Sequence, residues 1–508
     1  LAYFFTTKSI LRYQRLFENL HMSRMSMPNR VRVATIARVF LVVFITFPSI
    51  ASGIDLQSIE GTTWFGLYMN GQKVGYGFNT LDIADNGSVS VIEDASFKLN
   101  MVGMKQDMRI HSERLYAEDG ALRTIKSHVD DVTGPSEFEA VVDEQGLHLT
   151  SRVGGQERKE RLPKPKESLD DMIKLIALVN DHTKIGDKID FSIFEPMYRS
   201  EMQGTSVVTA IEKRMLDGAE TTVYTIESVL DQMGIKTVSF VTEDGLTLED
   251  QIAGGIITMR LEPEEIAKDV DYTNDVIVSN AATVDTPIKD PRERDSIRLR
   301  IAGPLDADNA ITDHRQSFEK DGESYVFTGR RQLKGALRSL DLPIKDDSVQ
   351  EWLKPTVFVQ SDNPRMIEKA KTIVRGETDA FRIVQLLSAW VFDNVNTTFS
   401  ARLTNSLEVL DHMEGDCTEH SMLFIGLARA AGIPAREAAG LIYVDGPRPG
   451  FYFHQWATAW VGEWVDVDPT FDQPIADATH IKLAQGDLFQ QTRLLPVIGR
   501  LHIEVLGD

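Results

Sequence analysis

The feature that most constrains how this chain can fold is a succession of turn-forming residue pairs between Ile54 and Val270. Asn70-Gly71, the strongest hairpin signal among them, separates Leu67-Tyr68-Met69 from Gln72-Lys73-Val74. The other pairs are Asn86-Gly87, Asp119-Gly120, Gln145-Gly146, Asp217-Gly218 and Asp244-Gly245. Successive turns between short alternating segments predict an antiparallel β-sheet that curls over a core or a groove. One helix, over Ser168–Val179, is predicted to interrupt it.

From Asn363 onward the sequence pattern changes from strands to helices. Asn363 before Pro364 is typical of a helix start. Further helices are predicted over Asp379–Val395 and from Cys417 to a stop at Gly432. Strands are predicted over residues 435–444, 451–461 and 464–467. Helices followed by an antiparallel sheet indicate an α+β domain, so the predicted fold class is multidomain, with an N-terminal antiparallel β-rich domain and a C-terminal α+β domain.

The chain has 508 residues, more than one hydrophobic core usually supports, so several domains are expected. The β-rich domain is placed at residues 54–280 and the α+β domain at 351–490. Between them, residues 281–350 are predicted to form a linker and a small β-rich module. Pro287 and Pro291 lie in the polar stretch that indicates the linker. Residues 491–508 are predicted to be a C-terminal tail.

An export signal is predicted over residues 27–53. Arginines precede an apolar run at Val39–Phe47, and small residues follow it at Ser49–Gly53. That run is nine residues long, whereas a membrane-spanning helix needs roughly 20, which favours a cleaved signal peptide over an uncleaved anchor. The sequence therefore predicts a periplasmic or extracellular protein without membrane insertion after signal cleavage. Residues 1–26 are treated as a leader of doubtful start and are excluded from fold reasoning.

The charge balance limits the classes of partner. The formal net charge is −22, and such an acidic surface repels nucleic acid backbones and anionic lipid. Hydrophobic residues make up 42% and charged residues 26% of the chain, which is ordinary for soluble globular protein. Nucleic acid and peripheral membrane binding are therefore disfavoured.

Cys417 is the only cysteine in the chain, so no intramolecular disulfide can form. It stands at the predicted start of a helix that is apolar nearly all round. The N-terminus of a helix presents partial positive charge, which lowers a cysteine pKa and favours the thiolate. The competing interpretation of a lone cysteine is a buried structural residue that packs as a small hydrophobe.

A histidine and a carboxylate follow the cysteine in an order typical of acyl-transfer sites. His454 lies in Phe451-Tyr452-Phe453-His454-Gln455-Trp456, with Trp456 on the same strand face. Gly462-Glu463 predicts a tight turn, which returns Asp468 to within a residue or two of His454. Asp466 shares the strand face of Asp468 and is its rival. For each residue alone, a structural role is the alternative; the order of the three together favours chemistry.

Residues from about 352 to 485 resemble the transglutaminase-like superfamily, the microbial branch of papain-fold cysteine enzymes. The matching segments are Ser361-Asp362-Asn363-Pro364, Gly415-Asp416-Cys417-Thr418-Glu419-His420, Arg429-Ala430-Ala431-Gly432-Ile433-Pro434-Ala435-Arg436, His454-Gln455-Trp456, Trp464 and Asp468-Pro469-Thr470. The resemblance implies a papain-like α+β fold with Cys417 as nucleophile, His454 as general base and acid, and Asp468 orienting the imidazole. It implies a protein or peptide substrate, and we expect no cofactor and no metal.

The sequence also departs from the family pattern. Gln455 stands where the family commonly has alanine, and we expect it to face away from the thiol and to affect specificity or packing. A side-chain donor to the oxyanion is not identified, although Asn394 and Asn396 are candidates.

Three functions are compatible with these residues. In the first, a thioester at Cys417 forms from an amide and is then hydrolysed or transferred to an amine, with a slight preference for hydrolysis. In the second, the protein is a non-enzymatic periplasmic binding or scaffold protein that retains a papain-like core. The third, a metal site of Cys417, His420 and His412, is disfavoured because structural zinc sites generally use more than one thiolate or a tight histidine pair.

Overall fold

The computed structural model describes residues 60–507, with gaps. The gaps are residues 102–103, 132–133, 154, 173–177, 180–181, 217, 232–233, 273–279, 333–334, 336, 357, 399–403, 446–447 and 487–490. The predicted leader and signal peptide lie outside the described residues. So do residues 173–177 of the helix predicted over Ser168–Val179 and Asp217 of one predicted turn. Residues 169–172 of that helix are described and are helical.

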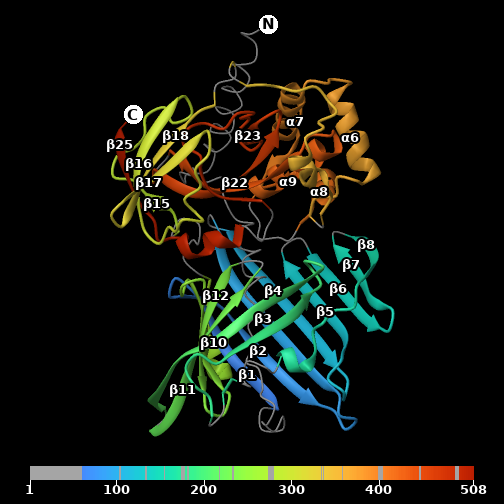
Figure 1. The fold of residues 1–508 in the computed structure, drawn as a ribbon, viewed down its shortest axis with the longest axis vertical. Coiled ribbons are helices and arrows are strands. Elements are labelled where there is room, and N and C mark those ends of the chain that lie inside the picture. The colour runs from blue at the N-terminus through green and yellow to red at the C-terminus, as the bar shows by residue number, and fades with distance from the viewer. Residues whose placement is uncertain are drawn as a thin grey trace.

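A single antiparallel sheet of 14 strands dominates the N-terminal half (Figure 1). Its order is β8-β7-β6-β5-β4-β3-β2-β1-β14-β13-β12-β11-β10-β9. The strands are β1 (Gly61–Met69), β2 (Gln72–Ile83), β3 (Val89–Met101), β4 (Met104–Tyr116), β5 (Leu122–Asp131), β6 (Gly134–Asp143), β7 (Gly146–Val153), β8 (Gln156–Leu162), β9 (Lys188–Glu195), β10 (Ser200–Leu216), β11 (Ala219–Leu230), β12 (Ile235–Thr242), β13 (Thr247–Ile252) and β14 (Ile257–Leu261). The short helix α4 (Glu264–Lys268) follows β14. The predicted antiparallel β-rich domain is confirmed.

The turn chemistry explains why neighbours along the chain are neighbours in the sheet. Asn70 and Gly71 both have positive φ, 48° and 76°. Two consecutive residues of that kind build the hairpin turn whose twist matches that of the flanking strands. In β1 and β2 the residues beside the turn pair as Met69 with Gln72. The one non-sequential pairing, β1 with β14, joins the two halves of the meander.

Side chains connect β9, at one end of this sheet, to two strands of the other half, β8 and β4. Arg199, which follows β9, forms an ion pair with Glu160 of β8, with Nε 2.9 Å from the carboxylate. Arg114 of β4 donates to the carbonyl oxygen of Phe194 in β9, at 3.3 Å. Arg114 also lies among three carboxylates: those of Glu93 and Glu167, which are buried, and that of Glu195, which is partly buried. Burial raises the pKa of all three carboxyls, and the positive charge of Arg114 opposes that rise.

We predict that Arg114→Leu destabilises this sheet by about 3–5 kcal/mol, because it leaves buried acidic groups without their cation. Urea unfolding followed by circular dichroism measures the change. The matched control is Arg152→Leu, whose half-exposed ion pairs with Glu137 and Glu157 should contribute about 1 kcal/mol or less. Equal midpoints for the two variants would contradict the role given to Arg114.

The C-terminal half contains helices and a second sheet. The α-helices are α6 (Pro364–Val374), α7 (Ala380–Asn394), α8 (Ser406–His412) and α9 (Cys417–Ala430), with a 3₁₀ helix, η3, at Asp347–Leu353. The sheet has the order β15-β22-β21-β24. Strand β23 pairs with the last residues of β22, on the edge of β22 opposite to β21. Its strands are β15 (Ala282–Thr283), β21 (Ala435–Val444), β22 (Gly450–Trp460), β23 (Trp464–Val467) and β24 (Ile481–Gly486). Helix α9 packs on β21 and β22 and is contacted by α6, α7 and α8.

Most of these elements follow the sequence prediction, but α8 and β24 were not predicted. Helix α8 begins with a reciprocal cap in which Asn405 accepts from the N–H of Glu408 and Glu408 accepts from that of Asn405. That N-x-x-E spacing is a recognisable helix-start signal that the prediction overlooked.

The remaining segments form a four-stranded sheet, β17-β18-β16-β25. Its strands are β16 (Ser296–Ala302), β17 (Gln316–Asp321), β18 (Ser324–Arg330) and β25 (His502–Gly507). The segment predicted as a C-terminal tail therefore supplies a 3₁₀ helix, η4 (Thr492–Val497), and an edge strand that pairs with the small β-rich module. A short parallel pair, β19 (Asn396–Thr397) and β20 (Glu414–Gly415), leads into α9.

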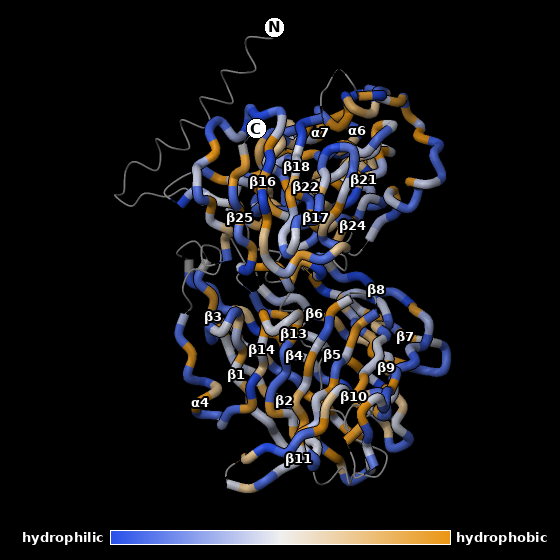
Figure 2. Tube along the Cα trace, turned by 60° about the vertical axis from the view of Figure 1, so that its left-hand side comes forward, coloured by the Kyte–Doolittle hydropathy of each residue, from blue (hydrophilic) through white to orange (hydrophobic). Residues whose placement is uncertain are grey.

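Figures 1 and 2 show two lobes, with β1–β14 and α4 in one and helices α6–α9 and the smaller sheets in the other. Apolar side chains join the lobes: Tyr452, Leu495 and Ile498 belong to the same buried cluster as the core of the large sheet. Asn70 donates to the side-chain oxygen of Asn280 across the junction, at 2.7 Å. Among the described residues, no helix combines the length and the apolar composition that a membrane crossing requires.

Candidate active site

Cys417 is the first residue of α9, as predicted, and is buried with 2% exposure. A reciprocal cap fixes this helix start: Asp416 accepts from the N–H of Thr418, and Glu419 accepts from the N–H of Asp416, both at 2.8 Å. Gly415 permits the cap, because a Cβ there would lie 2.2 Å from Cβ of Glu419. The residues around the cysteine thus place its sulfur rigidly at the helix end.

The prediction of a lowered cysteine pKa is wrong for this environment. Burial raises the pKa of the Cys417 thiol well above its ordinary value, and the nearby charges of Asp416, Glu419 and Asp468 add to the rise. The N–H of Gln455 donates to the sulfur and opposes it. The sequence argument considered the helix dipole alone, whereas the cap that builds this helix start brings two carboxylates to it. Burial and these charges therefore favour the neutral form of the thiol.

His454 lies on β22 and hydrogen-bonds to Asp468. Its Nε2 is 2.7 Å from Oδ2 of Asp468, and both side chains are fully buried. The β22–β23 register pairs Ala457 with Val467, which brings Asp468 to the strand position beside Trp456. Because Nε2 contacts the carboxylate, a proton exchanged with a thiol would pass through the other ring nitrogen, Nδ1.

The rival carboxylate, Asp466, has different partners. Its two oxygens accept from Nζ of Lys482 at 2.9 Å and from Nε of Arg315 at 3.0 Å. All three side chains are at most 2% exposed. Burial opposes ionisation of Asp466, but the two cations outweigh it and hold the pKa of that carboxyl well below its ordinary value. Asp466 is thus part of a buried ion cluster.

The strand that carries His454 is in direct contact with Cys417. Gln455, the next residue, donates its backbone N–H to the cysteine sulfur and accepts from Ser421 of α9 at its carbonyl, at 3.2 Å. The imidazole is enclosed by aromatic rings: Trp456 stacks at 6.0 Å between centroids, and Phe471 lies edge-on at 5.5 Å. The Gln455 side chain is buried as well.

A residue that the sequence reasoning missed, His480, lies beside this pair. Its Nε2 is 3.0 Å from the same oxygen of Asp468 that His454 contacts. His480 directly precedes β24, which the prediction also lacked. Gly440, the partner of His454 across β21 and β22, lets β24 approach, because a Cβ there would lie 1.9 Å from the carbonyl oxygen of Ile481. Gly440 was the available signal, since a glycine inside a strand often marks a close backbone approach.

Comparison with known proteins finds a family that this region resembles. Residues 367–469 match the model of the transglutaminase-like superfamily. The C-terminal part of the chain is transglutaminase-like. The matched range contains Cys417, His454 and Asp468, whereas His480 lies beyond its end.

An uncharacterized protein of Haemophilus influenzae is 33% identical to this chain over 118 residues. The match covers 22% of this chain and 31% of that protein, so the chain spans less than a third of the relative's length. The similarity to this relative is therefore limited to one region of the chain.

Among solved structures, a candidate cysteine protease from Cytophaga hutchinsonii aligns at a TM-score of 0.30, with 16% identity over 42% of this chain and 84% of that chain. A beta-barrel-like protein from Brucella abortus aligns at a TM-score of 0.31, with 11% identity over 40% of this chain and 95% of that chain. Likeness at these scores is weak, and the chemistry of the transglutaminase-like region rests on its own residues.

Of the four other residues considered from sequence, one is buried and three are exposed. Nδ1 of His420 lies 2.7 Å from the carbonyl oxygen of Asp416, and burial lowers the pKa of that histidine. His412 ends α8 on the surface. Asn394 is exposed and donates to the carbonyl of Trp390 in its own helix. The Asn396 side chain is also exposed.

Among the described residues, His454, Asp468 and His480 each offer one ligand atom within 4.8 Å of the others. Tetrahedral nitrogen and oxygen ligands at about 2.0–2.2 Å from a metal lie roughly 3.3 Å apart. Nε2 of His454 is 2.7 Å from the carboxylate oxygen, which is a hydrogen-bond distance. The expectation of a metal-independent site stays a prediction, which activity in the presence of EDTA tests.

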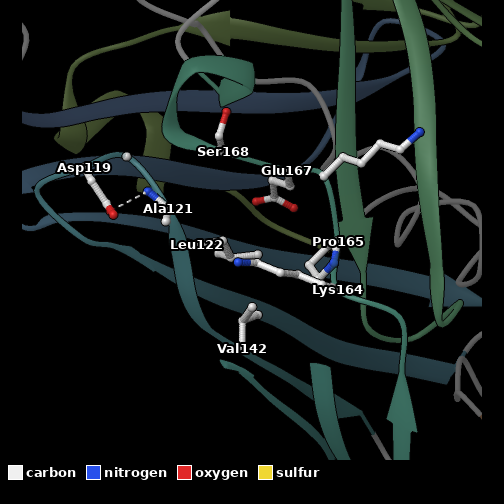
Figure 3. Close-up of a pocket in the computed structure, with 10 residues that line it drawn as sticks. Asp119, Ala121, Leu122, Val142, Lys164, Pro165, Glu167 and Ser168 are labelled. Atoms are coloured by element: carbon white, nitrogen blue, oxygen red, sulfur yellow. Dashed lines mark hydrogen bonds between the residues drawn. The ribbon is translucent and has the colours of Figure 1, made fainter. Parts of the chain in front are cut away.

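A surface cavity of about 260 Å³ lies in the other lobe, between the β4–β5 turn and the segment before Ser168 (Figure 3). Lys164 and Lys166 line it together with Glu167. The Glu167 carboxylate already accepts from the hydroxyl of Tyr116 at 2.5 Å and from the N–H of Phe194 at 2.6 Å. These hydrogen bonds connect Glu167 to strands β4 and β9 of the large sheet. The residues that line the cavity do not belong to the transglutaminase-like site.

Proposed function

We propose that the transglutaminase-like region is a cysteine enzyme that transfers acyl groups from amide bonds of protein or peptide substrates. Cys417 is its nucleophile, His454 its general base and acid, and Asp468 the residue that orients the imidazole. One observation carries the proposal: the strand bearing the Asp468-bound His454 also donates its Gln455 N–H to the cysteine sulfur. The base and its orienting carboxylate are therefore in contact, and the strand that carries the base contacts the nucleophile.

In the proposed reaction the Cys417 thiol gives its proton to Nδ1 of His454 as sulfur bonds to the amide carbon. The carbonyl oxygen becomes an oxyanion, which the backbone N–H of Cys417 at the helix start can stabilise. The imidazolium then returns the proton to the leaving amine as the C–N bond breaks, which leaves a thioester on Cys417. Water attacks the thioester with His454 again as base, and the thiol is restored as the carboxylic acid leaves.

The neutral resting thiol fits this sequence of steps. A thiolate buried beside Asp416, Glu419 and Asp468 is unfavourable until its proton is held by His454. Proton transfer is therefore coupled to attack on the carbonyl. The imidazolium that forms is stabilised by the Asp468 carboxylate 2.7 Å away.

We favour hydrolysis over amine transfer as the second half of the reaction, because water is the acceptor that is always present. Unfolded casein incubated with the protein, with and without a dansylated alkylamine, separates the outcomes. Hydrolysis gives new peptide termini by mass spectrometry; amine transfer gives fluorescent casein. EDTA should change neither rate.

The same experiment tests the non-enzymatic alternative. A wild-type protein that yields no product and no adduct on Cys417 with an activated acyl ester would support a binding or scaffold role. Cys417→Ala supplies the background for both assays.

We further propose that the protein acts in the periplasm or outside the cell, which the signal-like sequence of residues 27–53 supports. Fractionation of cells that produce the full chain tests this placement. Retention in the cytoplasm would contradict it.

A further inference from the structure

His480 is held between two carboxylates. Its Nε2 lies 3.0 Å from Oδ2 of Asp468, and its Nδ1 lies 3.2 Å from Oδ1 of Asp477. All three side chains have no exposed surface. An ionised carboxylate oxygen can only accept a hydrogen bond, so a ring that contacts one on each side carries a proton on both nitrogens. This geometry favours the imidazolium form of His480.

The surroundings of His480 balance that charge. Asp477 also accepts from Nη1 of Arg292 at 2.9 Å and from the N–H of Thr479 at 2.8 Å. Asp466 is near enough for its charge to interact with His480. Its own cations are Lys482 and Arg315, and Arg315 also donates to the carbonyl of His480. Burial opposes the charge of His480, but the carboxylates of Asp477 and Asp468 prevail and raise the pKa of that histidine.

The imidazolium and the base share one oxygen atom. Oδ2 of Asp468 accepts from Nε2 of His454 and from Nε2 of His480, whose ring centroids are 5.9 Å apart. A carboxylate held from two sides has less freedom to rotate than one held by a single ring. A positive charge at this distance also lowers the pKa of neighbouring groups, because it disfavours the protonated form of each relative to its deprotonated form.

We propose that His480 is a positioning residue: as an imidazolium anchored by Asp477, it holds Asp468 against His454 and offsets part of that carboxylate's negative charge. The proposal rests on the proposed function of Cys417 and His454. Its consequence is that the enzyme works at lower pH than a site with an uncompensated Asp468.

Two variants remove the charge in different ways. His480→Gln keeps a side-chain N–H for Asp468 but is neutral. Asp477→Asn leaves the ring in place but lets it be neutral, because an amide N–H can donate to Nδ1. We expect both to move the acidic limb of the kcat/KM profile upward by about one pH unit, which is roughly a tenfold loss on that limb. His502→Gln, at an exposed position on β25, is the matched control and should leave the profile unchanged.

Unshifted profiles in both variants, with activity retained, would overturn the proposal. Ring ¹⁵N spectra of the wild-type protein provide a test that needs neither variant to fold. We expect both nitrogens of His480 to be protonated at neutral pH, and a neutral ring would also overturn the proposal. If the wild-type protein shows no turnover, the proposed function fails, whereas these spectra and the pH dependence of Cys417 alkylation still decide the role of His480.

Discussion

Cys417→Ala is expected to reduce acyl transfer by roughly 10⁴-fold or more, because no other group in the site can form the thioester. The measurement is turnover of the substrate identified with casein, compared at equal protein concentration. Cys417→Ser, which keeps a hydroxyl in the same place, should be nearly as inactive, since its oxygen is far harder to deprotonate than sulfur. Retained turnover in Cys417→Ala would remove the nucleophile from the account.

The same substitution should leave folding nearly intact and should change its pH dependence. The folded protein raises the pKa of the Cys417 thiol, so its neutral form contributes stability below the unfolded value of about 8.5. That contribution is lost as the pH rises through the folded pKa. The free energy of unfolding, measured in urea, should therefore fall more in alkali for the wild type than for Cys417→Ala.

Asp466→Asn is expected to destabilise the C-terminal lobe by about 3–5 kcal/mol at neutral pH, because Arg315 and Lys482 would lose a buried counter-charge. The folded protein lowers the pKa of Asp466, so this contribution is present above about pH 4 and is lost as the pH falls further. Urea unfolding at pH 7 and at lower pH measures both effects. The difference in free energy of unfolding between wild type and variant should become smaller in acid.

Asp468→Asn is the matched comparison for that variant. It should lower turnover by roughly 10³–10⁴-fold, because the imidazole of His454 loses its tautomer and orientation. Greater loss of intrinsic activity in a folded Asp466→Asn than in Asp468→Asn would reverse the assignment of the two carboxylates.

The sequence predicted what local chemistry determines. The hairpin at Asn70-Gly71, the helix start at Cys417 and the tight turn after Trp460 are each decided by a few adjacent residues, and the structure has all three. The position of Asp468 opposite the strand of His454 follows from the last of these. Strands β21 and β23 have the predicted bounds for the same reason.

What the sequence could not predict depends on residues far apart in the chain. The pairing of β1 with β14 joins segments separated by almost 200 positions, and no local pattern specifies it. His480 reaches Asp468 only because β24 adds to β21 beside Gly440. The pKa of Cys417 was misjudged because it depends on burial and on Asp468 as well as on the helix start.

The most direct test of the account is the rate at which an activated acyl ester forms an adduct on Cys417, followed by intact-protein mass spectrometry in the wild type and in His454→Ala. At neutral pH the wild type should acylate about 10²–10⁴ times faster, because only His454 can take the proton from a buried neutral thiol. The ratio of the two acylation rates should decrease as the pH rises, because the thiol of the variant then ionises without a base. Equal rates at neutral pH would show that His454 does not activate Cys417, and the proposed acyl-transfer site would have to be abandoned.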